Sequence, residues 1–304
     1  MGPLPSPSTP AGTHGLTALL AHPAGAIVAL DFDGTLAEIV PDPEQARAHP
    51  RAVPALAALA PHVASIVVIT GRPAELAVKF GGFAGVPGLD HLVVLGHYGA
   101  ERWDAATGTV RAPAPHPGVS AARAELPALL DGAGHAATQG TAQGTAQGTA
   151  QDTAQGTAQD TAQGTWIEDK GQAFAVHTRR AADPQAAFDT LRAPLAALAT
   201  RHGLVLEPGR MVLELRPPGV DKGVALTKYA EESGAETVLY AGDDLGDLPA
   251  YAAVDTLRAK GHPGLLVCSG TEVPELSTRA DLTLPGPAAV ADFLAALAQA
   301  VSRT

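Results

Sequence analysis

The stretch that most constrains the fold is residues 26–36, which read AIVALDFDGTL. A run of apolar and small residues ends at Asp31 and is closed by Gly34, a pattern typical of a fully buried strand. Ligands of an open parallel sheet bind beyond the carboxyl ends of its strands, so Asp31 and Asp33 are expected to project into a crevice there. The two carboxylates leave the strand on one side and repel each other unless a cation or a shared proton intervenes. A solvated turn is the commoner explanation of an isolated D-x-D pair. The residues at the ends of the other strands therefore decide whether Asp31 and Asp33 belong to a functional site.

Two more buried strands are followed by polar residues in the same way. The strand at 66–69 ends in Thr-Gly-Arg-Pro at 70–73. There, the Thr70 hydroxyl and the backbone N–H groups at a helix start make an anion site, or the threonine simply caps the helix. The strand at 92–95 runs into the loop GHYGAE at 96–101, whose two glycines allow a ligand to approach the backbone.

The second half of the chain supplies a lysine and three more acids at comparable positions. Asp221 can cap a helix that begins at Lys222, yet a cation in the first turn opposes the helix dipole. This misfit indicates function, because a lysine there meets the anion that a helix N-terminus attracts. A further buried strand at 238–242 is followed by Asp243, Asp244 and Asp247, which form either a solvated loop or a site for a hard cation.

The acidic composition narrows the classes of partner. The chain has 304 residues, 46% of them hydrophobic, which is enough for two domains or one large one. Its 20 basic and 31 acidic residues give a net charge of −11 without a Lys/Arg-rich run, which argues against nucleic acid and against an anionic membrane surface. An anionic substrate would then need a metal or local cations.

Cysteine usage and hydropathy indicate the compartment. The single cysteine, Cys268, cannot form an internal disulfide. No stretch approaches the roughly 18 apolar residues of a membrane span, and the N-terminus lacks the basic-then-apolar order of a signal peptide. A cytoplasmic location is therefore expected.

Changes in composition along the chain predict the domains. Residues 1–21 are expected to be a disordered tail, with at most a short helix at 16–20. Residues 22–114 and 218–304 form an α/β core, and residues 115–217 form a smaller inserted α/β cap. The cap is expected to contain a hairpin at 166–179, a helix at 183–202 and a second hairpin turned at Pro208-Gly209. Within the cap, residues 138–165 carry a Thr-Ala-Gln-Gly/Asp repeat without large apolar residues, which is interpreted as a loop expansion.

Together, the strand ends resemble the four motifs of the haloacid dehalogenase superfamily of aspartate-nucleophile phosphotransferases, which implies a Rossmann-like core with a parallel sheet. The segments VVITGRP, LGHYGAERW, IEDKGQAFAVHTR and LELRPPGVDKG further resemble trehalose-6-phosphate phosphatases, over about residues 26–297. The segment GDDLGDL departs from the family's GDDxTDE at Gly246 and Leu248 but keeps all three aspartates.

The resemblance implies a Mg²⁺-dependent phosphatase that hydrolyses trehalose 6-phosphate through an aspartyl-phosphate. Asp31 would be the nucleophile, and Asp33 the general acid and base. Phosphate would be bound by Thr70, Gly71 and Lys222. Mg²⁺ would be bound by Asp31, Asp33, Asp243, Asp244 and Asp247. The sugar would contact Arg72, His97, Glu101, Glu168, Lys170, Arg179, Glu214 and Arg216. A trehalose-phosphate synthase would be a functional partner.

Other interpretations stay open at this point. The same core and cap class serves sucrose-phosphate and mannosylglycerate-type phosphatases, and the charged cap residues could simply form the outer face of a half-buried sheet. The phosphoryl group could instead pass from the aspartate to another acceptor. The domain could also have kept the fold as a regulatory module, although the presence of Asp31, Asp33 and Lys222 argues against this.

Overall fold

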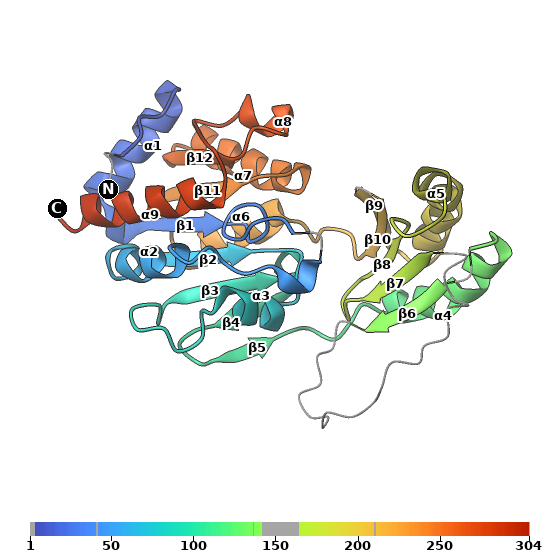
Figure 1. Ribbon diagram of the computed structural model, residues 1–304. Helices are drawn as coiled ribbons and strands as arrows, with labels where there is room; N and C mark the ends of the chain where they lie inside the picture. Colours follow the sequence, from blue (N-terminus) through green and yellow to red (C-terminus); the bar gives the residue numbers. More distant parts are fainter. Residues whose placement is uncertain (1–3, 41, 136, 142–163, 210, 304) are drawn as a thin grey trace. The chain divides into compact units, whose positions relative to one another are not determined.

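The computed structural model describes residues 4–40, 42–135, 137–141, 164–209 and 211–303. The chain divides into two compact units (Figure 1). The core unit comprises Met1–Pro113 and Val220–Thr304, and the inserted unit comprises Ala114–Gly219. The sequence placed these boundaries after residues 114 and 217. Within the described ranges, no helix combines the length and the apolar character that crossing a membrane requires.

The core unit is built on an eight-stranded sheet whose central strands are parallel. In spatial order the strands are β13 (Leu282–Leu284), β12 (Gly264–Ser269), β11 (Thr237–Gly242), β1 (Ala26–Leu30), β2 (Ser65–Ile69), β3 (Leu92–Gly96), β4 (Glu101–Asp104) and β5 (Thr109–Arg111). This confirms the predicted α/β class with a parallel sheet. The antiparallel strands β4 and β5, at one end of the sheet, were not predicted, because their sequences ERWD and TVR carry too few apolar residues to show a pattern.

Helices cover both faces of this sheet (Figure 1). The helices of the core unit are α1 (Pro10–Ala21), α2 (Ala52–Leu59), α3 (Ala74–Gly81), α6 (Lys222–Ser233), α7 (Leu248–Ala259), α8 (Pro274–Ser277) and α9 (Pro287–Val301). Short 3₁₀ turns lie at Pro23–Gly25, Pro43–Gln45, Ala60–His62, His97–Gly99 and Leu245–Asp247.

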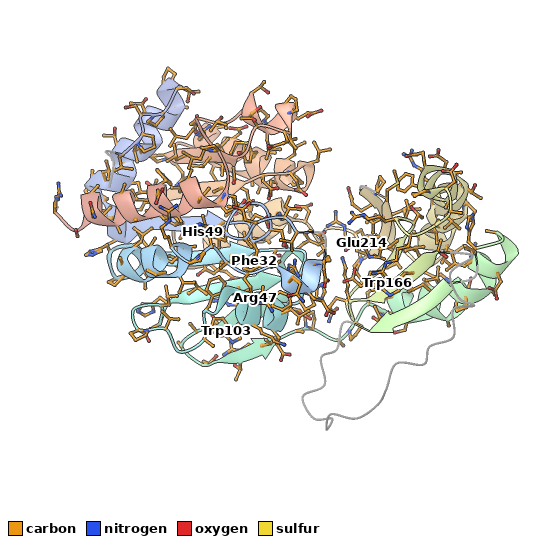
Figure 2. All side chains as sticks on the ribbon, viewed as in Figure 1. Phe32, Arg47, His49, Trp103, Trp166 and Glu214 are labelled. Atoms are coloured by element: carbon orange, nitrogen blue, oxygen red, sulfur yellow. The ribbon has the colours of Figure 1, made fainter. Side chains whose placement is uncertain are left out.

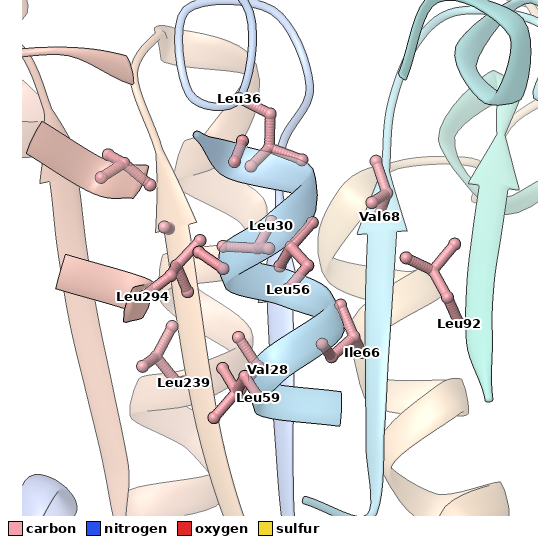
Figure 3. Packing of buried hydrophobic residues seen from close by; sticks show 14 of the residues in the cluster. Val28, Leu30, Leu36, Leu56, Leu59, Ile66, Val68, Leu92, Leu239 and Leu294 are labelled. Atoms are coloured by element: carbon pink, nitrogen blue, oxygen red, sulfur yellow. The ribbon is translucent and has the colours of Figure 1, made fainter. Parts of the chain in front are cut away.

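The alternation of side chains along each strand divides the apolar core into two layers. Val28 and Leu30 of β1 pack with residues of α1, α2, α3 and α9, as Figure 3 shows for part of this layer. Ile27 and Ala29 point to the other face, where residues of α6 and α7 cover them. Both faces are therefore covered, and the charged side chains that follow β1 and β11 lie beyond the strand ends.

The N-terminal segment contradicts the expected disordered tail. Helix α1 covers most of it and packs against β12 and β11. The Thr9 side chain accepts a hydrogen bond from the Gly12 N–H at 2.9 Å, which caps the helix. Leu16 and Leu19 are buried, so the helix contributes to the core. A capping threonine followed by proline was the missed signal.

The inserted unit has its own sheet and its own core. The strand order is β6 (Ala137–Thr141), β7 (Thr165–Asp169), β8 (Phe174–His177), β10 (Val212–Arg216) and β9 (Val205–Gly209). Helices α4 (Pro117–Gly132) and α5 (Pro184–Arg201) pack on one face, where Leu126, Leu195 and Leu213 belong to one buried cluster. The hairpin predicted at 166–179 is present as β7 and β8.

Two expectations for the inserted unit need correction. The first residues of the predicted repeat insert form β6, which pairs in parallel with β7, since an edge strand needs only backbone hydrogen bonds. Residues 142–163 of that insert lie outside the described residues. The second hairpin was expected to turn at Pro208-Gly209, but both residues belong to β9 and pair with Leu213 and Val212. β9 is an edge strand, where proline is tolerated because it removes no ladder hydrogen bond.

Candidate active site

A buried ion network lies where β1, β11 and α6 meet. Asp31 directly follows β1, and its N–H donates to the Ala241 carbonyl at 2.9 Å. Lys222 is the first residue of α6, whose N-cap is Asp221. Lys222 Nζ lies 2.8 Å from Asp31 Oδ1 and 2.7 Å from Asp247 Oδ1. All three charged side chains are buried, so the network brings together residues far apart in the sequence.

The charges in this network shift one another's titration. Burial raises the pKa of Asp31 well above its ordinary value, and the Lys222 ammonium offsets this only in part. Burial alone would lower the pKa of Lys222, but the carboxylates of Asp247 and Asp31 raise it well above its ordinary value. Lys222 is therefore held as a cation between the carboxylates of Asp31 and Asp247.

Asp247 is saturated by hydrogen-bond donors. Its Oδ1 accepts from Lys222 Nζ at 2.7 Å and from the Tyr240 hydroxyl at 2.5 Å. Its Oδ2 accepts from the N–H groups of Asp243 and Asp244 at 2.9 and 3.1 Å. The sequence suggested Asp247 as a metal ligand; its oxygens here fix Lys222 and the loop, and one of them also lies within 4.8 Å of oxygens of Asp31 and Asp243. Tyr240 was missed; a polar hydroxyl inside a buried apolar strand was the signal.

Three carboxylates of this region, including Asp247, fit a small hard cation. Carboxylate oxygens of Asp31, Asp243 and Asp247 all lie within 4.8 Å of one another. Asp243 Oδ1 is buried and has no hydrogen-bond partner among the described residues. A Cβ atom at Gly34, where φ is +75°, would lie 2.0 Å from Asp243 Oδ2, so only glycine leaves this carboxylate room. An all-oxygen donor set of this kind suits Mg²⁺.

Asp243 and Asp244 differ in exposure and role. Burial, followed by the charges of Asp247 and Asp244, raises the pKa of Asp243 to about 8. Asp244 is exposed, and its Oδ1 accepts from the Gly246 N–H at 2.8 Å. Asp244 and Asp247 cap the 3₁₀ turn after β11 reciprocally, so Asp244 shapes the loop in this structure.

Asp33 and Arg72 contact each other at the edge of this site. Arg72 Nη2 lies 2.7 Å from Asp33 Oδ1, and Arg72 Nε lies 2.7 Å from Asp33 Oδ2. Arg72 was expected to contact the sugar, so this pairing gives it a different partner. Thr70 is buried, and its Oγ1 accepts from the Arg72 N–H at 3.1 Å. The adjacent Gly71 lies so close to Tyr98 that a Cβ atom there would be 2.7 Å from the Tyr98 hydroxyl.

The loop after β3 supports the start of α3. Glu101 Oε2 accepts from the Ala74 N–H at 2.8 Å, at the first residue of that helix. Burial raises the pKa of Glu101. Glu101 Oε1 lies 3.6 Å from Nε2 of the buried His97, and His97 and Tyr98 have φ values of +47° and +57°. These two residues store backbone strain next to the site, in a loop that the sequence predicted to be functional.

A second polar cluster lies on the sheet of the inserted unit, where Figure 2 labels Trp166 and Glu214. Lys170 Nζ lies 2.7 Å from Glu214 Oε2 and 3.9 Å from Glu168 Oε2. Glu168 Oε2 is also 2.9 Å from His177 Nε2, a contact that sequence reasoning missed. The structure thus gathers three of the predicted sugar-binding residues on one face of one sheet.

Two further predicted sugar-binding residues, Arg216 and Arg179, belong to the same inserted unit. Arg216 Nη2 donates to Glu207 Oε2 at 2.9 Å, across the pair of strands β10 and β9. Arg179 follows β8 and is exposed.

Comparison with known sequences gives consistent matches. A family model described as trehalose-phosphatase matches residues 29–110 and 143–288. The trehalose-phosphate phosphatase of Mycobacterium avium (strain 104) is 31% identical over 292 residues, which cover 93% of this chain and 63% of that protein. The chain therefore spans less than two thirds of that relative's length.

Comparison with solved structures shows a common fold. The C-terminal domain of Candida albicans trehalose-6-phosphate phosphatase superposes with a TM-score of 0.68 at 18% identity, covering 98% of this chain and 99% of that one. Trehalose-6-phosphate phosphatase of Aspergillus fumigatus, in crystal form 3, gives a TM-score of 0.64 at 21% identity, covering 97% and 99%.

Proposed function

Because the chain belongs to the trehalose-phosphatase family, we propose that it hydrolyses trehalose 6-phosphate to trehalose and phosphate. The observation that carries the proposal is the buried contact of Lys222 with Asp31 and Asp247, at 2.8 and 2.7 Å. A carboxylate held beside a fixed cation at a strand end is suited to attack phosphorus while the cation stabilises the phosphoryl oxygens.

The nucleophile in this proposal is Asp31. One of its carboxylate oxygens forms a bond to phosphorus as the bond from phosphorus to the sugar oxygen breaks. Asp33 gives a proton to the leaving oxygen and later takes one from the water that releases phosphate from Asp31. Thr70 and Lys222 bind the phosphoryl oxygens, so that the charge that develops during transfer meets a preorganised site.

A Mg²⁺ ion fits the cluster of carboxylates near the end of β1. Asp31, Asp243 and the backbone carbonyl of Asp33 would hold it, because Asp243 has an oxygen without a hydrogen-bond partner among the described residues. When bound, the ion neutralises charge on the phosphoryl group. Asp247 would support the ion indirectly, since donors already occupy both of its oxygens.

The sugar specificity is assigned to the cluster Glu168, Lys170 and Glu214 of the inserted unit. Carboxylate and ammonium groups can accept and donate hydrogen bonds to sugar hydroxyls, and a site built this way rejects analogues that leave its polar groups unpaired. The core unit binds a phosphoryl group, which every sugar phosphate has, and therefore cannot by itself choose among sugars.

Phosphate release from a panel of sugar phosphates tests the proposal. The purified chain is assayed with trehalose 6-phosphate, sucrose 6-phosphate, mannosylglycerate phosphate and glucose 6-phosphate in the presence of Mg²⁺. We expect trehalose 6-phosphate to have the highest kcat/KM by a wide margin. If another sugar phosphate of the panel is hydrolysed equally well, the substrate must be reassigned. If none of the four is hydrolysed, the result favours a regulatory module of this fold.

A further inference from the structure

Arg72 contacts Asp33 at two points rather than one. Arg72 Nη2 lies 2.7 Å from Asp33 Oδ1, and Arg72 Nε lies 2.7 Å from Asp33 Oδ2. A planar guanidinium that meets both oxygens of a carboxylate fixes its rotation as well as its position. The Arg72 side chain is 15% exposed and that of Asp33 is 37% exposed, so the contact lies at the mouth of the site rather than in open solvent.

The guanidinium of Arg72 is held independently of Asp33. Its Nη1 donates to the Pro43 carbonyl at 3.0 Å. Its Cζ lies 5.2 Å from the centroid of the Phe80 ring and 5.8 Å from that of Phe32, the residue between the two motif aspartates. The guanidinium therefore touches a backbone carbonyl, two aromatic rings and a carboxylate. This arrangement makes it a rigid support for Asp33.

From this geometry we propose that Arg72 is a positioning residue for the general acid and base Asp33. The inference rests on the proposed phosphatase function and deepens it. In the first step, Asp31 bonds to phosphorus and the leaving oxygen keeps the electron pair of the broken bond. A proton that Asp33 has taken from solvent, or from the water of the preceding cycle, passes to that oxygen. In the second step, a water oxygen bonds to phosphorus, its proton returns to Asp33, and Asp31 is regenerated. Arg72 sets the direction in which the Asp33 oxygens face the leaving oxygen and the water.

This role differs from the sugar contact that the sequence suggested for Arg72. A sugar contact would affect only substrates that carry the sugar. A positioning role affects every substrate whose leaving group needs a proton, and it spares substrates whose leaving group departs as a stable anion. The leaving group therefore distinguishes the two roles, whichever sugar phosphate the protein prefers.

The experiment compares kcat/KM of the full chain for two aryl phosphates in the presence of Mg²⁺. Phenyl phosphate releases a phenol with a pKa of about 10, similar to that of a tyrosine side chain, whereas 2,4-dinitrophenyl phosphate releases a far more acidic phenol. The quantity kcat/KM reports steps up to release of the phenol, so it excludes hydrolysis of the aspartyl-phosphate. The variants are Arg72→Lys, which keeps an aliphatic stem over Phe80, and Arg72→Met, which removes the charge.

Arg47 supplies the matched control. It also lies over the Phe80 ring, 4.6 Å from the centroid, but its Nη1 donates to the carbonyls of Glu44 and Ala46. Figure 2 labels it. Arg47→Met removes a comparable cation from the same aromatic ring without changing the partners of Asp33. Thermal unfolding of all variants checks that each one is folded.

We expect both Arg72 variants to lose about 100-fold or more in kcat/KM on phenyl phosphate and less than about 5-fold on the dinitrophenyl ester, because a general acid contributes about 10²–10⁴ only where protonation is needed. Arg47→Met should match the wild type on both. Equal losses on both esters, or an Arg72→Lys variant that matches the wild type on phenyl phosphate, would overturn the proposal, since one ammonium cannot hold both carboxylate oxygens.

The outcome separates this inference from the proposed function. If the Arg72 variants show the predicted leaving-group pattern but the wild type has no preference for trehalose 6-phosphate, the sugar assignment fails and the role of Arg72 stands. If trehalose 6-phosphate is the preferred substrate but the pattern is absent, the proposed function stands and the role of Arg72 fails. A wild type that cleaves neither ester and no sugar phosphate overturns both.

Discussion

Lys222 and Asp31 form a buried ion pair, with Nζ 2.8 Å from Oδ1, across a sequence separation that spans the whole inserted unit. A buried pair of this kind costs desolvation, and it is strongly destabilising to break on one side. The fold accommodates the cost because Asp247 gives the ammonium a second carboxylate at 2.7 Å. The lysine that opposes the helix dipole in the sequence is therefore compensated by two acids in the structure.

The hydroxyl of Tyr240 should matter for activity as well as for stability. Tyr240→Phe removes the 2.5 Å hydrogen bond to Asp247 and leaves that buried carboxylate one donor short. We expect a loss of about 1.5–3 kcal/mol in unfolding free energy, measured by urea denaturation, together with lower kcat as Lys222 loses its fixed position.

Tyr251→Phe is the control for that variant. Tyr251 packs edge-on against Tyr240, and its hydroxyl donates to the Val267 carbonyl at 2.9 Å instead of to a charged group. It should lose about 1 kcal/mol of stability and keep wild-type kcat. If both variants keep wild-type kcat, Tyr240 serves the core alone.

Removal of divalent cations should abolish activity and lower thermal stability. The reason is the convergence of Asp31, Asp243 and Asp247 within 4.8 Å, which a cation relieves. Dialysis against chelator is expected to silence phosphate release, and Mg²⁺ should restore it and raise the Tm. The substitution Asp243→Asn should weaken Mg²⁺ binding, as measured by titration calorimetry. Full activity in excess chelator would show that the carboxylates serve another purpose.

Lys170→Ala should change the choice of substrate. The substitution removes the partner of the buried Glu214 at 2.7 Å and one donor for a sugar hydroxyl. We expect kcat/KM for trehalose 6-phosphate to fall about 10- to 100-fold, as for loss of a charged hydrogen bond, with aryl phosphates unaffected. Arg123→Ala, which removes a more exposed pair with Asp169 in the same unit, should affect neither. An equal loss on both substrates would make Lys170 structural.

Cys268 should resist thiol reagents in the native state. Burial raises the pKa of its thiol to about 11. At pH 8 the native thiolate is then more than about 100-fold scarcer than in the unfolded chain, where the pKa is near 8.5. Alkylation should be correspondingly slow and should accelerate as the pH approaches 11.

The raised pKa of the Cys268 thiol also affects the free energy of unfolding. The contribution linked to this thiol is complete below about pH 8.5 and is lost as pH rises through 11. If Cys268 of the native protein is alkylated at pH 8 as fast as Cys268 of the urea-unfolded chain, the thiol is not protected by burial.

The sequence predicted those parts of the molecule that depend on continuous apolar runs. The strands before Asp31, Thr70 and Asp243 are such runs, and the polar residues that follow them could be placed at strand ends. The contact between Asp33 and Arg72 could not be predicted, because it depends on how two loops meet over Phe80. The saturation of Asp247 depends on backbone N–H groups, which have no signature in the sequence.

Local signals that compete with composition were the other source of error. The segment before residue 22 has a low content of large apolar residues, yet Thr9 caps α1, and Leu16 and Leu19 anchor that helix on the core. Pro208 suggested a turn, but an edge strand tolerates proline. In both cases tertiary packing decided between local alternatives that the sequence left nearly equal.

The most direct test of the central claim is phosphate release from trehalose 6-phosphate by the wild type and by Asp31→Asn, measured in parallel with Mg²⁺ and with thermal unfolding as a check on folding. An amide cannot serve as the nucleophile, so we expect turnover by the wild type and a loss of more than about 100-fold in kcat, or about 3 kcal/mol, in the folded variant. Retention of more than about a hundredth of wild-type kcat by Asp31→Asn would contradict it.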